Sequence, residues 1–408
     1  MSGKCGIRNS GSGIAVRGGA AARSAAGAMQ HVKFEAIAIN SVAKKKPTAE
    51  DAAHYIGLEH IDPGCFVVSR WGGDVAPIGD KLLMKKGDVL FGRRRAYQRK
   101  VAIAPFDGIF SAHGMVLRPK TDVVDEKFFP FFIASDQFMN EAIRISVGGL
   151  SPTINWGTLK NCEFDLPPMD EQKKLAELLW AANDLKESYK KAITATDEML
   201  KAKFREMFGD AGDDASRGGA ETRSVELREC ITDILGGKTP SMSNSEFYGG
   251  DVPFIKSGDV REDYISEGSV WLSDKALSKG GAKYVPKGAV IIVVRSATLK
   301  NELRVAVAKQ DVVINQDLKA FVPSQDYLPT FLMLAIRMQA EVLLSCVKTM
   351  LTSHIEVEEI CKLPIPALSL SLQREFVAIA DKAELAKANL KKSIAAIDQV
   401  MKGLINHG

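Results

Sequence analysis

The side chains best suited to chemistry in this sequence form a basic cluster between residues 85 and 100. Seven cations stand there against one acid, Asp88, with one aromatic ring and one amide among them. Guanidinium groups bind phosphate oxygens and the O6 and N7 atoms of guanine, and an amide matches adenine. The cluster therefore predicts contact with a nucleic acid, and a solvated hairpin is the alternative. The predicted contact residues are Lys85, Lys86, Arg93, Arg94, Arg95, Tyr97, Gln98, Arg99 and Lys100.

A weaker echo of this cluster occurs later in the chain. Lys86 recurs as Lys287 and Arg94 as Arg295, both 201 residues on (287 − 86 and 295 − 94). The second half of the chain is therefore expected to contact the same kind of ligand. Its predicted contact residues are Lys238, Thr239, Lys256, Arg295, Lys300 and Arg304.

Motifs that would indicate an enzyme are incomplete. Residues 236–239 resemble the end of a phosphate-binding loop, but Thr232 stands where that motif needs its first glycine. Residues 166–169 contain two prolines, but they lack the acid or amide and the aromatic residue of the Asp/Asn-Pro-Pro-aromatic motif of amino-methyltransferases. Paired acids or a Ser–His arrangement with interpretable spacing are also missing. We therefore predict a binding protein without catalysis and without a cofactor.

The composition describes an ordinary soluble protein. The chain has 408 residues, a length that is enough for two or three domains. Its net charge is +4, and 46% of its residues are hydrophobic, as in soluble globular proteins. No apolar run is long enough to span a bilayer. Six cysteines without a Cys-x-x-Cys pair, and no secretion signal, predict reduced thiols in a cytoplasm. His54, His60 and Cys65 lack a fourth ligand, so no metal site is expected.

The elements that must position the basic residues follow from an internal repeat. From residue 150 to about 208 the sequence matches residues 351–408 without a gap, so that Gln172 pairs with Gln373 and Asp197 with Asp398 at a constant separation of 201 (373 − 172). Two copies are too few for a solenoid. The repeat therefore indicates a tandem duplication of a half-molecule.

Each copy of the repeat ends in a predicted long helix. No Pro or Gly occurs between Glu171 and Gly209, which allows about 57 Å of helix. Apolar residues at heptad spacing predict an antiparallel coiled coil of the two copies within one chain, with two ordinary core helices as the alternative. The predicted seam comprises Leu178, Ala182, Leu185, Tyr189, Ala192 and Met199 in the first copy and Ile379, Ala383, Ala386, Leu390, Ile397 and Val400 in the second.

The fold class predicted is mixed α/β (α+β), with two recognition domains separated by the two helices. Strands are expected at residues 66–68, 89–91, 101–104, 115–117 and 289–294, and helices at 128–145 and 327–346. The predicted parts are a disordered extension at 1–29, a first domain at 30–150, a central helical region at 151–208, a linker at 209–222, a second domain at 223–350 and a distal helical region at 351–408. For the extension, a true start at Met29 and a flexible basic arm that touches DNA are the alternatives.

Taken together, several motifs resemble the specificity (S) subunit of type I restriction–modification systems. Residues 237–241 (Gly-Lys-Thr-Pro-Ser) and 248–254 (Tyr-Gly-Gly-Asp-Val-Pro-Phe) are similar to the Gly-x-Thr-Pro opening and Gly-Asp-Ile-Pro-Trp strand of its target-recognition domains. Residues 86–90 and 106–111 resemble the body of that domain, and residues 166–172 resemble the Pro-Pro-x-x-x-Gln entry to its helices. The resemblance covers residues 30 to 408.

The resemblance implies a non-catalytic subunit that reads a split site in double-stranded DNA. Each recognition domain would read one half-site, and the helices would set their separation. Two methyltransferase (modification) subunits would dock on the helices and bind the methyl donor, and motor–nuclease (restriction) subunits would join them. The competing hypotheses are a stand-alone nucleic-acid methyltransferase or nuclease, and a coiled-coil protein scaffold.

Overall fold

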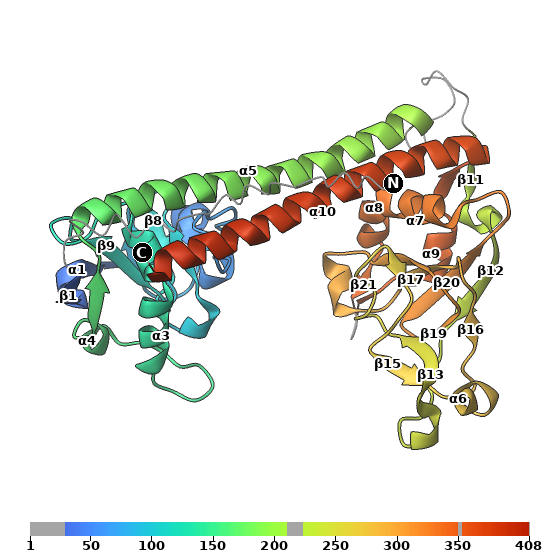
Figure 1. Cartoon of the computed structure of the whole chain (residues 1–408), viewed down its shortest axis with the longest axis horizontal. Helices are drawn as coiled ribbons and strands as arrows, with labels where there is room; N and C mark the ends of the chain where they lie inside the picture. The colour runs from blue at the N-terminus through green and yellow to red at the C-terminus, as the bar shows by residue number, and fades with distance from the viewer. Residues whose placement is uncertain (1–28, 210–222, 350–352, 408) are drawn as a thin grey trace, which may run out of the picture. The chain divides into compact units, whose positions relative to one another are not determined.

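The computed structural model describes residues 29–209, 223–349 and 353–407 (Figure 1). The chain forms two compact units, of which the first holds the described residues up to Ser188 and those from Ser393 on, and the second holds residues 189–392. Each unit therefore contains one recognition domain and part of both long helices. None of the described helices is both long and apolar enough to cross a membrane. The predicted extension at 1–29 and linker at 209–222 lie almost wholly outside the described residues.

The first unit contains two four-stranded sheets. Hydrophobic residues of both sheets and of the helices behind them form its core. One sheet has the order β2 (Ala38–Ser41), β9 (Met115–Pro119), β6 (Val89–Phe91), β7 (Val101–Ile103). The other has the order β3 (Lys44–Lys45), β5 (Lys81–Met84), β8 (Gly108–Phe110), β4 (Tyr55–Ile56), in which β4 and β8 are parallel.

The second unit repeats this plan. Its first sheet has the order β12 (Ile231–Gly236), β20 (Leu318–Pro323), β17 (Val290–Val293), β18 (Val305–Ala308), β14 (Tyr264–Ile265). Its second sheet has the order β15 (Val270–Leu272), β13 (Tyr248–Ile255), β19 (Val312–Ile314), β16 (Tyr284–Val285). The central strands β9, β6 and β7 correspond in order to β20, β17 and β18. The duplication inferred from the helices therefore extends through the sheets, where little sequence likeness remains.

The shorter elements join each domain to its helix. Two-stranded pairs are formed by β1 (Gln30–Lys33) with β10 (Glu163–Leu166), β11 (Ser224–Glu226) with β23 (Pro364–Pro366), and β21 (Lys348–Thr349) with β22 (Ser353–His354). The short helices are α1 (Phe34–Ile37), α4 (Trp156–Leu159), α6 (Asp274–Ser278) and α9 (Val357–Cys361). The 3₁₀ turns are η1 (Ala49–His54), η2 (Leu58–His60), η3 (Ala96–Gln98), η4 (Leu227–Cys230), η5 (Ser245–Phe247) and η6 (Ala297–Lys300).

Three of the local predictions were wrong in detail. The strand expected at 66–68 is absent. The Phe66 carbonyl accepts one hydrogen bond from the Ile103 N–H at the end of β7, at 2.9 Å, but no strand forms there, and the Phe66 ring packs against Phe131 and Trp180. The helix expected at 128–145 is two helices, α2 (Phe129–Ala134) and α3 (Asp136–Arg144). Ser135 between them is extended, and its hydroxyl accepts a hydrogen bond from the Phe138 N–H as an N-cap.

The helix expected at 327–346 is likewise two helices. They are α7 (Pro329–Met338) and α8 (Ala340–Ser345), and they meet at Gln339. The side chain of Gln339 donates to the carbonyls of Ala335 and Pro364, at 3.2 and 2.8 Å. The break therefore lies at a buried amide that joins α7 to β23, a partner that local propensity does not reveal.

The two predicted long helices are confirmed. They are α5 (Met169–Phe208) and α10 (Leu370–His407). In the first unit, Leu179 of α5 and Met401 of α10 belong to one core. In the second unit, Phe204 of α5 and Phe376 of α10 do so, with ring centroids 5.2 Å apart. The beginning of each helix therefore meets the end of the other, which is an antiparallel pair.

The predicted seam of this pair needs a correction. Three predicted seam residues of α5 are exposed: Leu178, Leu185 and Met199, at 57%, 45% and 51% of full exposure. In α10, the predicted seam residue Val400 is 59% exposed. The buried row lies one residue later in each helix. It comprises Leu179, Lys186 and Leu200 in α5, and Ala380 and Met401 in α10. Of the other seam residues, Ala383 is buried, Ala182, Tyr189, Ala192, Ile379, Leu390 and Ile397 are half-buried, and Ala386 is exposed. Adjacent rows both carry apolar residues, so spacing alone could not decide which row faces the partner helix.

A buried glutamine fixes each domain to the start of its long helix. Gln172 and Gln373, the repeat-related pair, are both fully buried. Each side-chain amide nitrogen donates to the backbone carbonyl five residues earlier. It also donates to a carbonyl in the turn that precedes α2 in the first unit or α7 in the second. Each side-chain amide oxygen accepts a hydrogen bond from a backbone N–H of that same turn. The bonds join Gln172 to Pro167, Val123 and Asp125, and Gln373 to Leu368, Asp326 and Leu328.

Candidate nucleic-acid interface

The basic segment 93–100 follows strand β6 and is held against the loop that begins the repeat. Arg94 forms an isolated antiparallel bridge with Thr153. The Arg95 N–H donates to the Pro152 carbonyl at 2.8 Å, and the Ile154 N–H donates to the Arg93 carbonyl at 3.0 Å. The start of the repeated sequence is therefore the surface that supports the basic residues.

The turn at the centre of the segment is strained. Arg95 and Arg99 have φ values of +57° and +52°, and they are the non-glycine residues with positive φ in the described part of the chain. A non-glycine residue in this region costs about 1–3 kcal/mol, and such strain gathers at functional sites. Between them, η3 holds Tyr97 with 54% of its surface exposed. An aromatic ring flanked by arginines on a rigid turn can stack on a base or a sugar while its neighbours contact phosphates.

The structure divides the predicted contact residues of the first unit into two groups. Arg94, Arg95, Tyr97 and Gln98 lie together on the turn and its approach, and Arg93 reaches inward to the Ala112 carbonyl at 3.2 Å. Lys85 and Lys86 are exposed, but they precede β6 and so lie at its other end.

Two cations of the cluster already have partners within the unit. The Arg99 guanidinium is 2.5 Å from the Asp136 carboxylate. The Lys100 ammonium donates to the Leu58 carbonyl at 2.6 Å. We therefore assign structural contacts to Arg99 and Lys100, which their sequence neighbourhood did not reveal.

His113 adds an aromatic nitrogen to this surface. Its Nε2 lies 3.4 Å from the Arg94 guanidinium. Burial lowers the pKa of His113, and the nearby charges of Arg94, Arg93 and Lys81 lower that pKa further. The ring is therefore neutral at neutral pH, and it can accept a hydrogen bond from Arg94 without adding to the local positive charge.

The second unit holds its basic segment in the same way. Arg295 forms an isolated bridge with His354, and the Ile355 N–H donates to the Val294 carbonyl at 2.9 Å. These residues stand 201 positions after Arg94, Thr153, Ile154 and Arg93 (355 − 154). Arg295 and Lys300 are exposed. The geometry at the start of the repeat is therefore duplicated along with the sequence.

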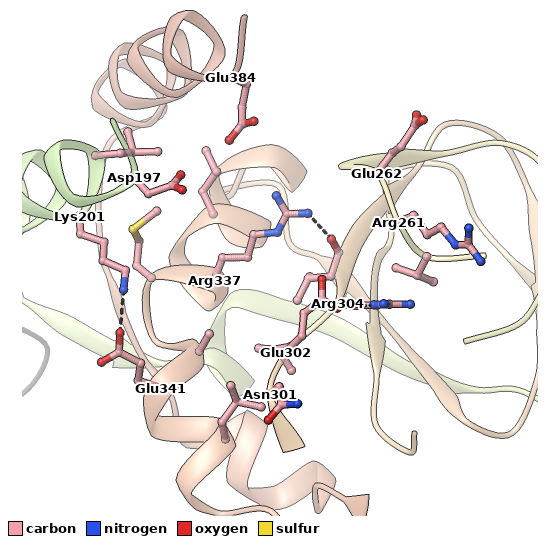
Figure 2. A pocket seen from close by; sticks show the side chains of 18 of the residues that line it. Asp197, Lys201, Arg261, Glu262, Asn301, Glu302, Arg304, Arg337, Glu341 and Glu384 are labelled. Carbon is pink, nitrogen blue, oxygen red and sulfur yellow. Dashed lines mark hydrogen bonds and ion pairs between the residues drawn. The ribbon is translucent and has the colours of Figure 1, made fainter. Parts of the chain in front are cut away.

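Arg304 lines a cavity of about 580 Å³ between the second domain and the long helices (Figure 2). Its guanidinium is 2.9 Å from the Glu302 carboxylate. Figure 2 also shows Lys201 of α5 directed at Glu341 of α8, with 2.7 Å between the charged atoms. The backbone of Arg304 nevertheless adjoins the segment of Arg295, because the Arg304 carbonyl accepts from the Val293 N–H at 3.0 Å.

The remaining predicted residues of the second unit surround the Gly-x-Thr-Pro opening. A side chain on Gly237 would meet the Asn315 carbonyl at 2.0 Å, so only glycine fits there. The Thr239 hydroxyl bonds to the Gln316 amide at 2.5 Å, and Lys238 beside it is exposed. Lys256 follows Ile255, whose carbonyl accepts from the Asn315 N–H at 3.0 Å, and the Lys256 ammonium lies 5.9 Å from the centre of the Phe254 ring.

Two lysines of the first unit were missed as candidate contacts. Lys44, in β3, and Lys46, which follows β3, are exposed, and they come after β2 in the chain as the Gly-x-Thr-Pro turn comes after the corresponding strand β12. The signal was present as three consecutive lysines before Pro47-Thr48. The first unit lacks the Gly-x-Thr-Pro motif that marks the equivalent turn of the second. Within the residues described, no three His, Cys, Asp or Glu side chains group as metal ligands do.

Comparison with known proteins identifies the family. The type I restriction modification DNA specificity domain matches residues 39–195 and 224–399, one match over most of each half. A specificity subunit of the type I restriction enzyme EcoR124I/EcoR124II from Escherichia coli is 27% identical over 150 residues, which are 36% of this chain and 37% of that protein. The chain's match thus spans little more than a third of that relative.

A longer match and a solved structure agree with this assignment. The HindI specificity subunit from Haemophilus influenzae is 21% identical over 63% of this chain and 71% of its own length. A solved chain from a study of complex assembly and conformational transition of the type I R-M system shares the fold, with a TM-score of 0.58 and 20% identity over 92% of this chain and 96% of that chain. With two matching domains that cover most of the sequence, the chain belongs to the family of type I restriction–modification DNA specificity proteins.

Proposed function

We propose that this chain is the DNA-recognition subunit of a type I restriction–modification complex and reads a bipartite site in double-stranded DNA. The observation that carries the proposal is the duplicated basic segment. In each unit it is held by the same backbone bonds to the start of the repeat, with Arg95 exposed in one and Arg295 in the other. Two similar supports with different side chains suit two half-sites of different sequence.

The chain itself is proposed to be non-catalytic. Modification subunits in the cytoplasm would bring the methyl donor, and restriction subunits would bring the motor and nuclease activities. The predicted chemistry of this chain is confined to positioning and reading DNA, for which arginine forks and a rigid aromatic turn are sufficient.

The long helices are proposed to bind two modification subunits. The exposed stripe of α5, made of Leu178, Leu185 and Met199, is not covered by α10. Val400 of α10 is exposed at the repeat position of Met199 (400 − 199 = 201). Exposed apolar rows on a helix are typical of protein–protein contacts. Native mass spectrometry of the saturated complex should find two modification subunits, and a one-to-one complex would contradict this part of the proposal.

The DNA-binding role is tested by the salt dependence of affinity. Each phosphate contact contributes about −0.9 to the slope of log affinity against log salt. Replacing Arg93, Arg94, Arg95, Arg99 and Lys100 together by Ala should weaken binding and flatten this slope. Because Arg99 and Lys100 have structural partners, the sharper variant replaces only Arg94 and Arg95. An unchanged slope in both variants would contradict a role of this segment in DNA binding.

The competing functions predict different results in the same assays. A protein scaffold would show no salt-dependent affinity for DNA. A stand-alone methyltransferase would transfer labelled methyl groups to DNA without a partner subunit. We expect salt-dependent affinity, and transfer only when modification subunits are added.

A further inference from the structure

A single carboxylate in the first unit connects the basic segment to the end of α10. Asp136 is the first residue of α3, and its Oδ1 is 2.5 Å from the Arg99 guanidinium. Its Oδ2 accepts from the Asn406 amide at 3.2 Å and lies 3.4 Å from the Lys402 ammonium. The backbone N–H of Asp136 donates to the side-chain amide oxygen of Asn406 at 2.8 Å. Residues far apart in sequence are thus held by one side chain.

The contact falls on the strained turn. Arg99 is one of the two left-handed residues that bracket η3, and the other, Arg95, is held by Pro152 and by the Ser151 hydroxyl at 3.2 Å. The two ends of the turn are therefore fixed from different sides, by the repeat loop at Arg95 and by Asp136 at Arg99. A strained turn keeps its conformation only while its surroundings hold it. Loss of one support should release the turn that presents Tyr97.

The charge on this carboxylate suits that role. Burial raises the pKa of Asp136, but the hydrogen bonds and charges of Arg99 and Lys402 outweigh burial, so that its pKa lies below the usual value. Asp136 is therefore ionised at neutral pH, and its neutral isostere would lose both ionic contacts.

The second unit keeps half of this arrangement. Lys201 stands 201 residues before Lys402 and pairs with Glu341 of α8 (Figure 2). The backbone near the second basic segment is instead held by Arg337, whose guanidinium donates to the Val305 carbonyl at 2.5 Å and to Asp263 at 2.6 Å. A lysine of the long helix thus contacts the domain in both units, but only in the first does the same acid also hold the basic turn.

We propose that Asp136 is a positioning residue for DNA recognition, which holds the Arg95–Arg99 turn in its reading conformation and makes that conformation depend on the last turns of α10. This inference rests on the proposed function of the turn as a DNA contact. It assigns to Asp136, Asn406 and Lys402 a role in specificity without any contact with DNA.

The test uses the full chain assembled with its modification subunits. Affinities are measured for the selected site and for sites altered in one half at a time. Asp136→Asn should lower affinity about five- to twentyfold and reduce discrimination only at the first domain's half-site. The salt slope should not fall, because no phosphate-binding cation is lost, whereas Arg95→Ala should lower it by about 0.9.

Two further variants separate positioning from a general loss of folding. Asn406→Ala should give a smaller effect at the same half-site, and its effect should not add to that of Asp136→Asn because both act through one contact. Glu341→Gln breaks the ion pair at the repeat-related lysine and should leave the first half-site unchanged. Equal loss at both half-sites, additive effects, or unchanged discrimination in Asp136→Asn would each overturn the proposal.

Failure of the underlying function gives a different pattern. If Arg95→Ala and Tyr97→Ala leave affinity and salt slope unchanged, the turn does not contact DNA, and both proposals are overturned. If those variants weaken binding while Asp136→Asn does not, only the positioning role is overturned.

Discussion

Lys186 of α5 and Asp398 of α10 form an ion pair with 2.7 Å between the charged atoms, and the repeat reproduces this pair with the helices exchanged. In the second unit Lys387 of α10 lies 2.5 Å from Asp197 of α5, and each residue stands 201 positions from its counterpart (387 − 186 and 398 − 197). Both lysines are nearly buried, at 8% and 11% side-chain exposure. Each unit thus fixes the register of the antiparallel pair with one ammonium and one carboxylate of the other helix, and Lys387 also pairs with Glu384 of its own helix at 2.6 Å.

Removing the carboxylate should cost more than removing the lysine. Asp398→Ala leaves a buried ammonium with only the Gly64 carbonyl, and we expect a loss of about 1–3 kcal/mol in unfolding free energy. Lys186→Met removes the buried charge and should cost less. Denaturant unfolding measures both, with Asp381→Ala, at an exposed site on α10, as the control expected within about 0.5 kcal/mol of the parent. A larger loss for Lys186→Met would contradict this assignment.

The buried glutamines should be important for stability rather than for DNA reading. Gln172→Ala leaves two carbonyls and one N–H without their partner, and we expect a loss of about 2–4 kcal/mol. Gln373→Ala should cost a similar amount in the second unit. The control is Gln399→Ala, at an exposed position of α10. Calorimetry on the three variants measures the effect, and equal melting temperatures for Gln172→Ala and the control would refute it.

The exposed stripe of α5 should bind a partner subunit. The double variant Leu178→Lys, Leu185→Lys places charges where apolar contact is proposed, so modification subunits should bind at least tenfold more weakly. The isolated chain should fold normally because both residues are exposed. Glu177→Lys adds a comparable charge beside the stripe and should have little effect. Sedimentation or native mass spectrometry measures assembly, and full assembly by the double variant would exclude this surface.

Helix length should set the spacer between half-sites. Four residues inserted after Ala195 add about 6 Å and a rotation of about 40°. An insertion in α5 alone would shift one ion pair against the other, so a matched insertion after Ala396 of α10 is needed to keep both pairs. Because DNA rises about 3.4 Å per base pair, the preferred spacer should lengthen by one or two pairs with both half-sites unchanged.

Selection from a randomised DNA pool checks this expectation. The single insertion after Ala195 serves as the comparison, and it should assemble less stably than the double insertion. Retention of the original spacer by the double variant, or loss of one half-site's sequence, would show that the helices do not act as the ruler.

The pairing of β1 should weaken as pH rises above about 6.5. Hydrogen bonds first to Asp165 and then to Glu163 raise the pKa of His31 in the folded protein. The contribution of the charged His31 is therefore complete below about pH 6.5, its unfolded value, and disappears as pH rises through the folded pKa. Amide exchange in β1, corrected for intrinsic rates, should become faster over that interval. His31→Gln should abolish the pH dependence, and a dependence that persists in this variant would exclude His31 as its source.

Sequence alone determined the larger organisation of this protein. The constant separation of Gln172 and Gln373, with no Pro or Gly in the helices that follow them, was sufficient to predict a duplicated half-molecule and two long helices. Strands β6, β7, β9 and β17 were also predicted, because buried β-branched runs bounded by turn residues carry a strong local signal. These features depend on neighbours within the same segment.

The tertiary structure decided which residues are free to act. Leu178 and Leu179 both fit a heptad row, and only the packing of α10 selects Leu179 as the buried one. Arg99 appears in the sequence as one more cation of a basic cluster, yet its partner Asp136 is 37 residues away and makes it a support of the turn. Spacing reports periodicity within an element, whereas the partner of a charge and the buried side of a helix depend on elements that the chain brings together only by folding.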